Sequence, residues 1–338
     1  MQTGRVEPRP EPGVPHRRSA TFLRRTAEGG GPRTVAIALG ANLVIAAAKL
    51  VAGLTTGSTG LLAEAAHSLA DSMNEVFLFV GLQRNRQPAD VEHPLGHGRE
   101  TFLWAFLATI ASFLIGGCVS VGLAVRELEL RHAVTPGIAA WVVLAISFVA
   151  DGISWRQGIR QARRQAKDYG LSTWRYLVRA SDPIVRAVVV EDSAALAGLA
   201  LAALGLLLSD LLGSSVPDSL ASLLIGLLLM ATAYGIARPL MDLLIGRSIA
   251  APQLEELRKI LEGDPAIEEV LSFRATYLGP EEVIVAAKIR PSGRLRAEEL
   301  ARAMDEIDHK IRLAQPFVAD VYLDVTAHRA KDGPLEDR

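Results

Sequence analysis

The stretch TFLWAFLATIASFLIGGCVSVGLAV, residues 101–125, decides the fold class, because all 25 of its residues are uncharged. A run of about 20 apolar residues is enough to cross a bilayer as an α-helix. The whole chain agrees with this assignment: 50% of its 338 residues are hydrophobic and its mean hydropathy is +0.25, which exceeds the composition of an ordinary soluble domain. The sequence therefore predicts a membrane protein.

Five further apolar runs have roughly membrane-crossing length, at about 34–54, 59–83, 136–158, 185–209 and 218–242. Together they predict an all-α bundle of six transmembrane helices over residues 34–246. Short segments rich in Lys and Arg stay on the cytosolic side of a membrane. Residues 1–33 hold seven Arg and three Glu, and the loop 156–186 holds eight Lys or Arg and two Asp. Both segments are therefore expected in the cytosol, residues 1–33 as a disordered basic arm, and with six spans both termini lie on that side.

Residues 247–330 have a different character. Helical periodicity, two alternating segments, an amphipathic helix and a last alternating segment follow one another there. This order predicts a small cytosolic α+β domain. Residues 331–338 are expected to be a disordered tail.

A polar stripe interrupts the second apolar run, at Glu64, His67, Asp71 and Glu75. Steps of three and four residues place these side chains on one face of a helix. His67 and Asp71 can both reach one divalent cation, and this donor pair suits Zn²⁺, Mn²⁺, Fe²⁺ or Co²⁺ better than Cu⁺. An ionised group at the bilayer centre costs roughly 2.5–3.5 kcal/mol, which a bound dication would offset. Hydrogen bonds between helices, or a water cavity with no ion, are the alternative.

The fifth run carries Glu191 and Asp192 side by side, followed by small residues that let helices approach closely. The simplest site combines His67, Asp71 and Asp192, with Glu191 or water as the fourth ligand. Adjacent helical residues diverge by about 100°, so the two acids cannot both point squarely at one ion. Cys118 is the only cysteine, which excludes a disulfide framework and a zinc site of several thiolates.

Four segments in order resemble the cation diffusion facilitator family, and most of all its branch of mitochondrial-type zinc transporters: GLLAEAAHSLADSMNEVFLFVGL (60–82), HPLGHGRE (93–100), SDPIVRAVVVEDSAALAGL (181–199) and DSLASLLIGLLLMATAYGIARPLMDLLIG (218–246). The resemblance covers about residues 35–330. It implies a homodimeric antiporter of divalent metal and protons, with no enzymatic activity. It also implies six transmembrane helices and a C-terminal α+β ferredoxin-like cytosolic domain.

The resemblance carries over to particular residues. His67 and Asp71 match the family's first pair of transport ligands, and Asp192 matches the acidic member of the second pair; these three would also exchange protons. Val188 stands where many members have His. Zn²⁺ is the favoured cargo, but fewer imidazoles favour harder ions such as Mn²⁺ or Fe²⁺ unless Glu191 fills the place, and Co²⁺ is a further alternative.

Two more positions match features of relatives. Asp90, His93 and His97, in the loop after the second run, are candidates for a second metal site; a structured turn is the alternative. Arg99 and Asp242 match a charge pair at the dimer interface of relatives, with plain surface charge as the alternative.

The functional hypothesis is metal efflux from the cytosol by alternating access, in a plasma membrane of bacterial type. An intramembrane metalloenzyme that activates water and a non-transporting metal sensor are the alternatives. A net charge of −1 gives no basic field for nucleic acid. The partners expected are therefore the metal ion, protons, the lipid bilayer and a second copy of the chain.

Overall fold

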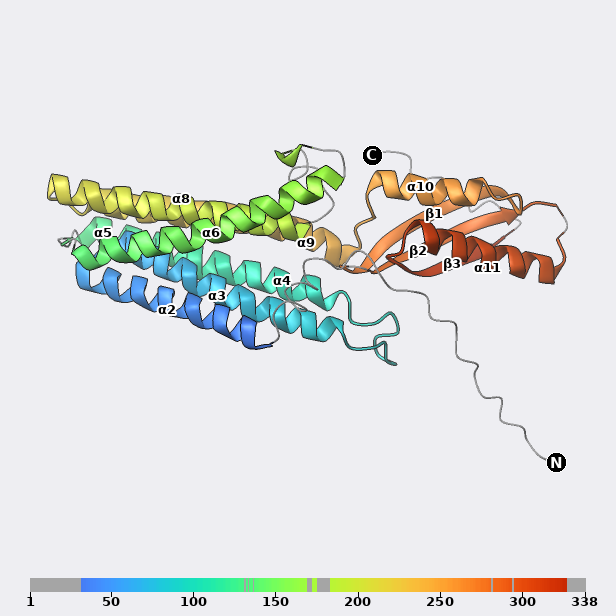
Figure 1. The fold of residues 1–338 in the computed structure, drawn as a ribbon, viewed down its shortest axis with the longest axis horizontal. Helices are drawn as coiled ribbons and strands as arrows, with labels where there is room; N and C mark the ends of the chain where they lie inside the picture. Colours follow the sequence, from blue (N-terminus) through green and yellow to red (C-terminus); the bar gives the residue numbers. More distant parts are fainter. Residues whose placement is uncertain are drawn as a thin grey trace, which may run out of the picture.

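The structure, a computed structural model, describes residues 32–130, 132, 134–135, 137–168, 172–174, 183–280, 282–293 and 295–326. Nearly all of the expected basic arm and the whole expected tail lie outside these residues. The described chain is elongated, with a bundle of long helices at one end and a small α+β domain at the other (Figure 1).

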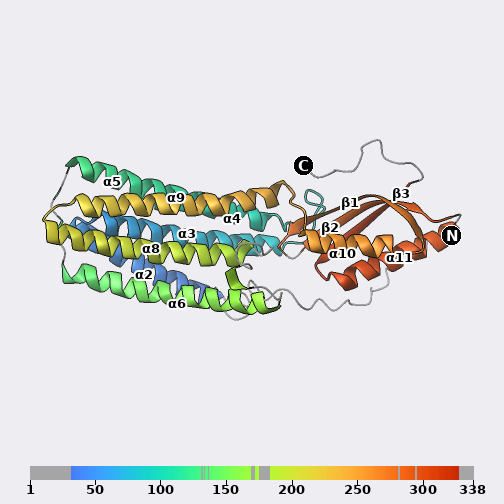
Figure 2. The same cartoon turned by 90° about the horizontal axis from the view of Figure 1, so that it is seen from above.

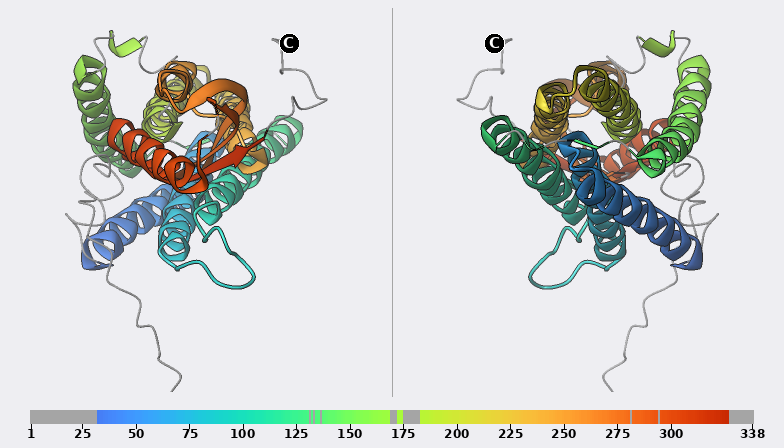
Figure 3. Two further views of the ribbon diagram at one scale, coloured as in Figure 1. Left: turned by 90° about the vertical axis from the view of Figure 1, so that its right-hand side faces the viewer. Right: turned by 90° about the vertical axis from the view of Figure 1, so that its left-hand side faces the viewer.

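Helices occupy all six of the predicted apolar runs. Three successive segments, α4, the π-helix η1 and α5, form one continuous helix in the third run. The bounds are α2 (Pro32–Thr56), α3 (Thr59–Asn85), α4 (Glu100–Ala111), η1 (Ser112–Cys118), α5 (Val119–Leu130), α6 (Ile138–Asp168), α8 (Pro183–Leu212) and α9 (Val216–Ile245). In the end-on views, α2 and α6 lie on one side of the bundle and α4–α5 on the other (Figure 3).

Five helical segments among the described residues are long and apolar enough to cross a membrane: Leu39–Thr56, Glu100–Leu130, Ile138–Arg164, Val188–Leu212 and Val216–Ile245. The helix α3 falls short of this measure because the polar stripe lowers its hydropathy. It runs through the bundle, in contact with α2, α4, α8 and α9 (Figure 2). A bundle with five apolar helices is therefore shown, and α3 as a sixth span stays a prediction.

A buried carboxylate fixes the start of α3 against the start of α9. Asp218 of α9, which is 0% exposed, accepts hydrogen bonds from Ser58 Oγ at 2.6 Å, Thr59 Oγ1 at 3.0 Å and Gly60 N at 3.1 Å. Ser58 Oγ also caps α3 by accepting from Leu61 N at 3.1 Å. Because the first backbone N–H groups of a helix have no partner within it, Asp218 satisfies α3 and joins it to α9 at once.

The C-terminal domain follows α9 in the predicted order: α10 (Ala251–Glu262), β1 (Ile267–Gly279), β2 (Glu282–Pro291), α11 (Ala297–Ala314) and β3 (Val318–Val325). Its three described strands form a sheet in the order β1-β2-β3, with β1 antiparallel and β3 parallel to β2. Both helices share one core with the sheet, in which the side chains of Leu257, Leu261, Ile289, Ile307 and Ile311 are fully buried. The order of elements is confirmed, whereas the ferredoxin-like type stays a prediction.

The domain contacts the helical bundle through the segment after α9 and through the loop before α4. Ser248, just after α9, forms an isolated bridge with Thr276 of β1. Gly98, just before α4, lies against the end of β1, where an added Cβ would be only 2.6 Å from the carbonyl oxygen of Leu278. Glycine is therefore required at position 98, and the loop before α4 packs directly on the domain.

We predict that Asp218→Ala lowers the thermal unfolding temperature of the purified protein in detergent. The change removes a charged acceptor from three donors, and each such hydrogen bond contributes about 1.5–3 kcal/mol. Asp210→Ala, at an exposed position of α8, is the matched control. Equal unfolding temperatures for the two variants would contradict the role given to Asp218.

Candidate metal centre

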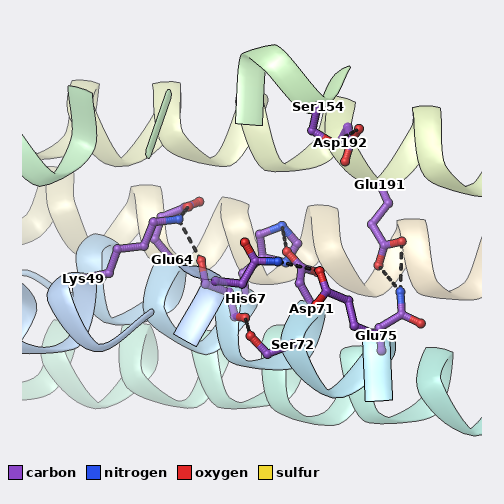
Figure 4. A network of polar contacts seen from close by, with 12 residues as sticks. Lys49, Glu64, His67, Asp71, Ser72, Glu75, Ser154, Glu191 and Asp192 are labelled. Atoms are coloured by element: carbon purple, nitrogen blue, oxygen red, sulfur yellow. Dashed lines mark hydrogen bonds and ion pairs between the residues drawn. The ribbon is translucent and has the colours of Figure 1, made fainter. Parts of the chain in front are cut away.

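The polar stripe of α3 points into the bundle. His67 is 2% exposed, and its Nε2 lies 3.6 Å from Asp71 Oδ2 (Figure 4). Both ring nitrogens of His67 and Oδ1 of Asp71 are buried without a hydrogen-bond partner. Leaving a buried polar atom unsatisfied costs about 1–3 kcal/mol, so these atoms fit the ligands of an ion better than a finished hydrogen-bond network.

A cavity of about 20 Å³ adjoins His67. That is room for about one water molecule or one cation, since a single probe sphere of water needs at least about 10–15 Å³. The cavity is lined from four sides of the bundle, by His67 and Asn74 of α3, Thr109 and Ser112 of α4 and η1, Glu191 and Ala194 of α8, and Leu229, Thr232, Ala233 and Ile236 of α9.

The two neighbouring acids of α8 face different helices. Glu191 extends toward α3, where Asn74 Nδ2 donates to both of its carboxylate oxygens at 3.2 Å. Asp192 turns to α6 and accepts from Ser154 Oγ at 3.0 Å (Figure 4). In this conformation the structure therefore brings Glu191 to the cavity of His67, and it does not bring Asp192 there.

Val188 lies on the Asp192 side of α8. A Cβ added at Gly158 of α6 would be 3.8 Å from Val188 Cγ1 and 4.0 Å from Asp192 Oδ2. The position at which many relatives carry His thus faces α6 here, while Glu191 supplies a donor beside His67. Asn74, Thr109, Ser112 and Thr232 are polar cavity residues that the sequence did not single out. Only Asn74 had a signal, since it follows His67 by seven residues, a spacing that places both on one face of α3.

The other two acids of the stripe have partners on α2. Glu75 accepts from Asn42 Nδ2 at 2.5 Å, and Glu64 accepts from Lys49 Nζ at 3.0 Å. Hydrogen bonds between helices, the alternative to metal binding, thus account for one oxygen of each glutamate. They leave the second oxygen of each, both ring nitrogens of His67 and Oδ1 of Asp71 without partners.

The loop after α3 brings its three candidates together. Among the described residues, Asp90, His93 and His97 are the only His, Cys, Asp or Glu trio whose ligand atoms all lie within 4.8 Å of one another. Asp90 Oδ2 is 3.1 Å from His97 Nε2, and Asp90 Oδ1 is 3.4 Å from His93 Nδ1. The other nitrogen of His97, Nδ1, lies 2.8 Å from Glu100 Oε1, an arrangement that orients the ring of a metal-ligating histidine.

Hydrogen bonds set the protonation of this loop. The backbone N–H of His93 and the ring of His97 lower the pKa of the Asp90 carboxyl. Glu100 and Asp90 raise the pKa of His97 above its usual value, so a cation that takes His97 must displace a firmly held proton. Asp90 also accepts from the backbone N–H groups of Glu92 and His93, which would hold the turn without metal, so a structured turn also fits.

Arg99 and Asp242 are both exposed, near the start of α4 and the end of α9. The structure contains one copy of the chain. Their role as a charge pair across a dimer interface therefore stays a prediction.

The apolar helices, with the imidazole of His67 and the carboxylate of Glu191 on one cavity between them, define a multi-pass membrane protein of the cation-handling class. A family profile described as the cation efflux transmembrane domain matches residues 35–245. The chain belongs to this family, the cation diffusion facilitators.

Three relatives illustrate the similarity. The mitochondrial proton-coupled zinc antiporter SLC30A9 of Xenopus laevis is 32% identical over 247 residues, which are 73% of this chain and 44% of the relative. Metal tolerance protein C4 of Arabidopsis thaliana is 29% identical over 263 residues, 78% of this chain and 58% of the relative. The manganese efflux system protein MneP of Bacillus subtilis is 23% identical over 252 residues, 72% of this chain and 78% of the relative. The chain thus spans about half the length of the first two relatives.

We predict that Glu191→Gln weakens Zn²⁺ binding more than Asp192→Asn does. Glu191 lines the cavity of His67, whereas Asp192 bonds to α6. Substitution of residues at or next to a metal centre typically lowers metal affinity by about 10–100-fold. Glu191→Gln should therefore lower the Zn²⁺ affinity by about 100-fold, and Asp192→Asn by about tenfold or less. Equilibrium titration in nanodiscs measures both, and the opposite ranking would show that α8 presents Asp192 to the ion.

We also predict that His93→Ala combined with His97→Ala lowers the amount of bound Zn²⁺ per chain by one ion, because the loop trio then keeps only Asp90. Elemental analysis of the dialysed full-length protein measures this amount. His309→Ala, at an exposed position of α11, is the matched control. An unchanged metal content would leave the loop as a structured turn.

Proposed function

We propose that the chain exports a divalent metal cation from the cytosol in exchange for protons, by alternating access of one site between α3 and α8. The observation that carries the proposal is that both ring nitrogens of His67 and Oδ1 of Asp71 are buried without partners, and that His67 and Glu191 line one cavity. Family membership and the names of the relatives support the same activity.

The ligand chemistry couples metal to protons. A cation needs the neutral imidazole of His67 and the ionised carboxylates of Asp71 and Glu191, so protons and metal compete for the same atoms. Protons that reach these groups from the far side of the membrane favour release of the metal. Asp192, with Ser154 on α6, is placed to take part when α8 turns.

The shape of the cavity supports entry from the side of the C-terminal domain. From His67 the cavity extends along α3 to Asn74, toward the end of the bundle that meets that domain. In the opposite direction the bundle is filled by the fully buried side chains of Leu61, Leu199, Leu206 and Ile225. This packing is consistent with entry of the cation from the side of the C-terminal domain.

Transport fits the cavity better than the metalloenzyme alternative does. A volume of about 20 Å³ holds an ion, whereas pockets for organic ligands have about 300–1,000 Å³. The proposal includes six spans with α3 as the second, both termini in the cytosol, a homodimer, and a plasma membrane of bacterial type. Cell fractionation of the expressing cell tests the last of these.

Zn²⁺ is the cargo we propose, and Mn²⁺, Fe²⁺ and Co²⁺ are the competing ions. SLC30A9 is named a zinc antiporter and MneP a manganese efflux protein, and one imidazole among carboxylates suits each of these ions. In proteoliposomes, equimolar Mn²⁺, Fe²⁺ or Co²⁺ should inhibit Zn²⁺ transport only weakly. Strong inhibition by one of these ions would make that ion the cargo.

We predict that His67→Ala and Asp71→Ala each reduce pH-driven Zn²⁺ transport in proteoliposomes to the level of protein-free vesicles, because each removes one of the two donors that α3 supplies. Asp210→Ala is the control for expression and insertion. Transport retained by both ligand variants would refute the proposed site.

A further inference from the structure

A buried ion pair lies one turn from His67. Lys49 of α2 is 1% exposed and Glu64 of α3 is 0% exposed, with Nζ and Oε2 3.0 Å apart (Figure 4). Lys49 also donates to Ser68 Oγ at 2.8 Å. Among the described residues Lys49 is the only buried Lys or Arg, so it is the one lysine amine enclosed with the acids of the stripe.

Stability alone does not account for this pair. Desolvation of two charges offsets most of their attraction, and apolar side chains of similar size often stabilise a fold as well. The second oxygen of Glu64, Oε1, is buried without a partner. A Cβ added at Gly198 of α8 would lie 2.4 Å from that oxygen, so three helices close around a carboxylate that is only half satisfied.

The position of Glu64 relates it to the metal centre. It precedes His67 by three residues, on the side away from the cavity, and the fully buried Leu61, Leu199 and Ile225 lie beyond it. A cation that leaves His67 and Asp71 in that direction meets Glu64 as the next ionisable group of α3. That carboxylate is already paired with the side-chain nitrogen of Lys49.

The charges around the pair are otherwise acidic. Asp71 and Glu75 belong to α3, Asp151 to α6, and Glu191 and Asp192 to α8. Lys49 acts electrostatically on both His67 and Asp71. Its positive charge therefore offsets the negative charge of these acids and opposes the approach of a second cation.

We propose that Lys49 is a built-in counter-cation of the transport pathway: its ammonium occupies Glu64 while no metal is bound, and it must leave Glu64 for the metal to pass beyond His67. This inference rests on the proposed function. It makes Lys49 and Glu64 positioning residues on the exit side of the centre, distinct from the ligands.

The test is a charge cycle in the full-length protein, with Lys49→Gln, Glu64→Gln and the double variant. Half-saturating Zn²⁺ is measured by titration in nanodiscs and the maximal rate in proteoliposomes. Lys49→Gln frees a carboxylate and should bind Zn²⁺ about tenfold more tightly, while Glu64→Gln leaves an unbalanced cation and should bind about tenfold more weakly. Both should transport more slowly than the wild type.

The double variant is decisive even if a single variant, left with one buried charge, fails to insert. Its charge balance is restored, so the half-saturating Zn²⁺ concentration should stay within about threefold of the wild-type value. The maximal transport rate should fall at least about tenfold, because the carboxylate on the exit side is gone. Lys49→Arg keeps the charge and should retain both values. Asp210→Ala, at an exposed position of α8, is the matched control.

Two outcomes overturn the inference: single variants that shift half-saturation in the same direction or not at all, and a double variant that transports at the full rate. Either result would leave the pair as a structural contact. If the wild type transports and His67→Ala does not, the proposed function stands even when this inference fails. A wild type without metal transport would remove the proposed function itself.

Discussion

Ionised side chains inside an apolar helix bundle need partners, and this constraint organises the described membrane part of the chain. Glu64 and Glu75 of α3 each bond to a residue of α2, and Glu191 of α8 bonds to Asn74 of α3. Lipid supplies no hydrophobic force between helices, so polar contacts of this kind decide which helices are neighbours. His67 differs from the two glutamates of the stripe, because neither of its ring nitrogens has a hydrogen-bond partner, whereas Glu64 and Glu75 each use one oxygen in a bond to α2. The pairing of the stripe is therefore least complete at the cation centre.

Much of this architecture could be predicted from the sequence. The helices follow apolar runs, which are long and uniform, and the stripe from Glu64 to Glu75 follows from a spacing of three and four residues. The rotation of α8 could not be predicted in the same way. Spacing shows that Glu191 and Asp192 diverge, but the facing residues Ser154 and Asn74 decide which acid meets α3, and they lie far away in the chain. Likewise, nothing in the local sequence indicates that Gly98 packs on Leu278.

The loop, the bundle and the domain form one connected path. Asp90, His93 and His97 lie between the end of α3 and the start of α4, and Gly98 follows them directly in contact with the end of β1. Only a short segment of chain thus separates the candidate ligands of the loop from the helix that carries His67, and the next residue packs on the sheet. A conformational change in the loop would therefore also displace its neighbours, because the chain on either side is packed.

The π-helical segment Ser112–Cys118 gives the third apolar run an unusual geometry. Each of its turns closes on the fifth residue and so holds one residue more than an α-helical turn. Gly116 then lies beside Ala70 and the backbone of His67, and Gly117 beside Met230 of α9. Removal of one residue from this segment would restore a regular helix and keep α5 in phase with α4, because the wider turn and the α-helical turn each complete one rotation. Single-residue differences in length between homologues are therefore expected to concentrate here, where the helix can gain or lose a residue without a change of phase.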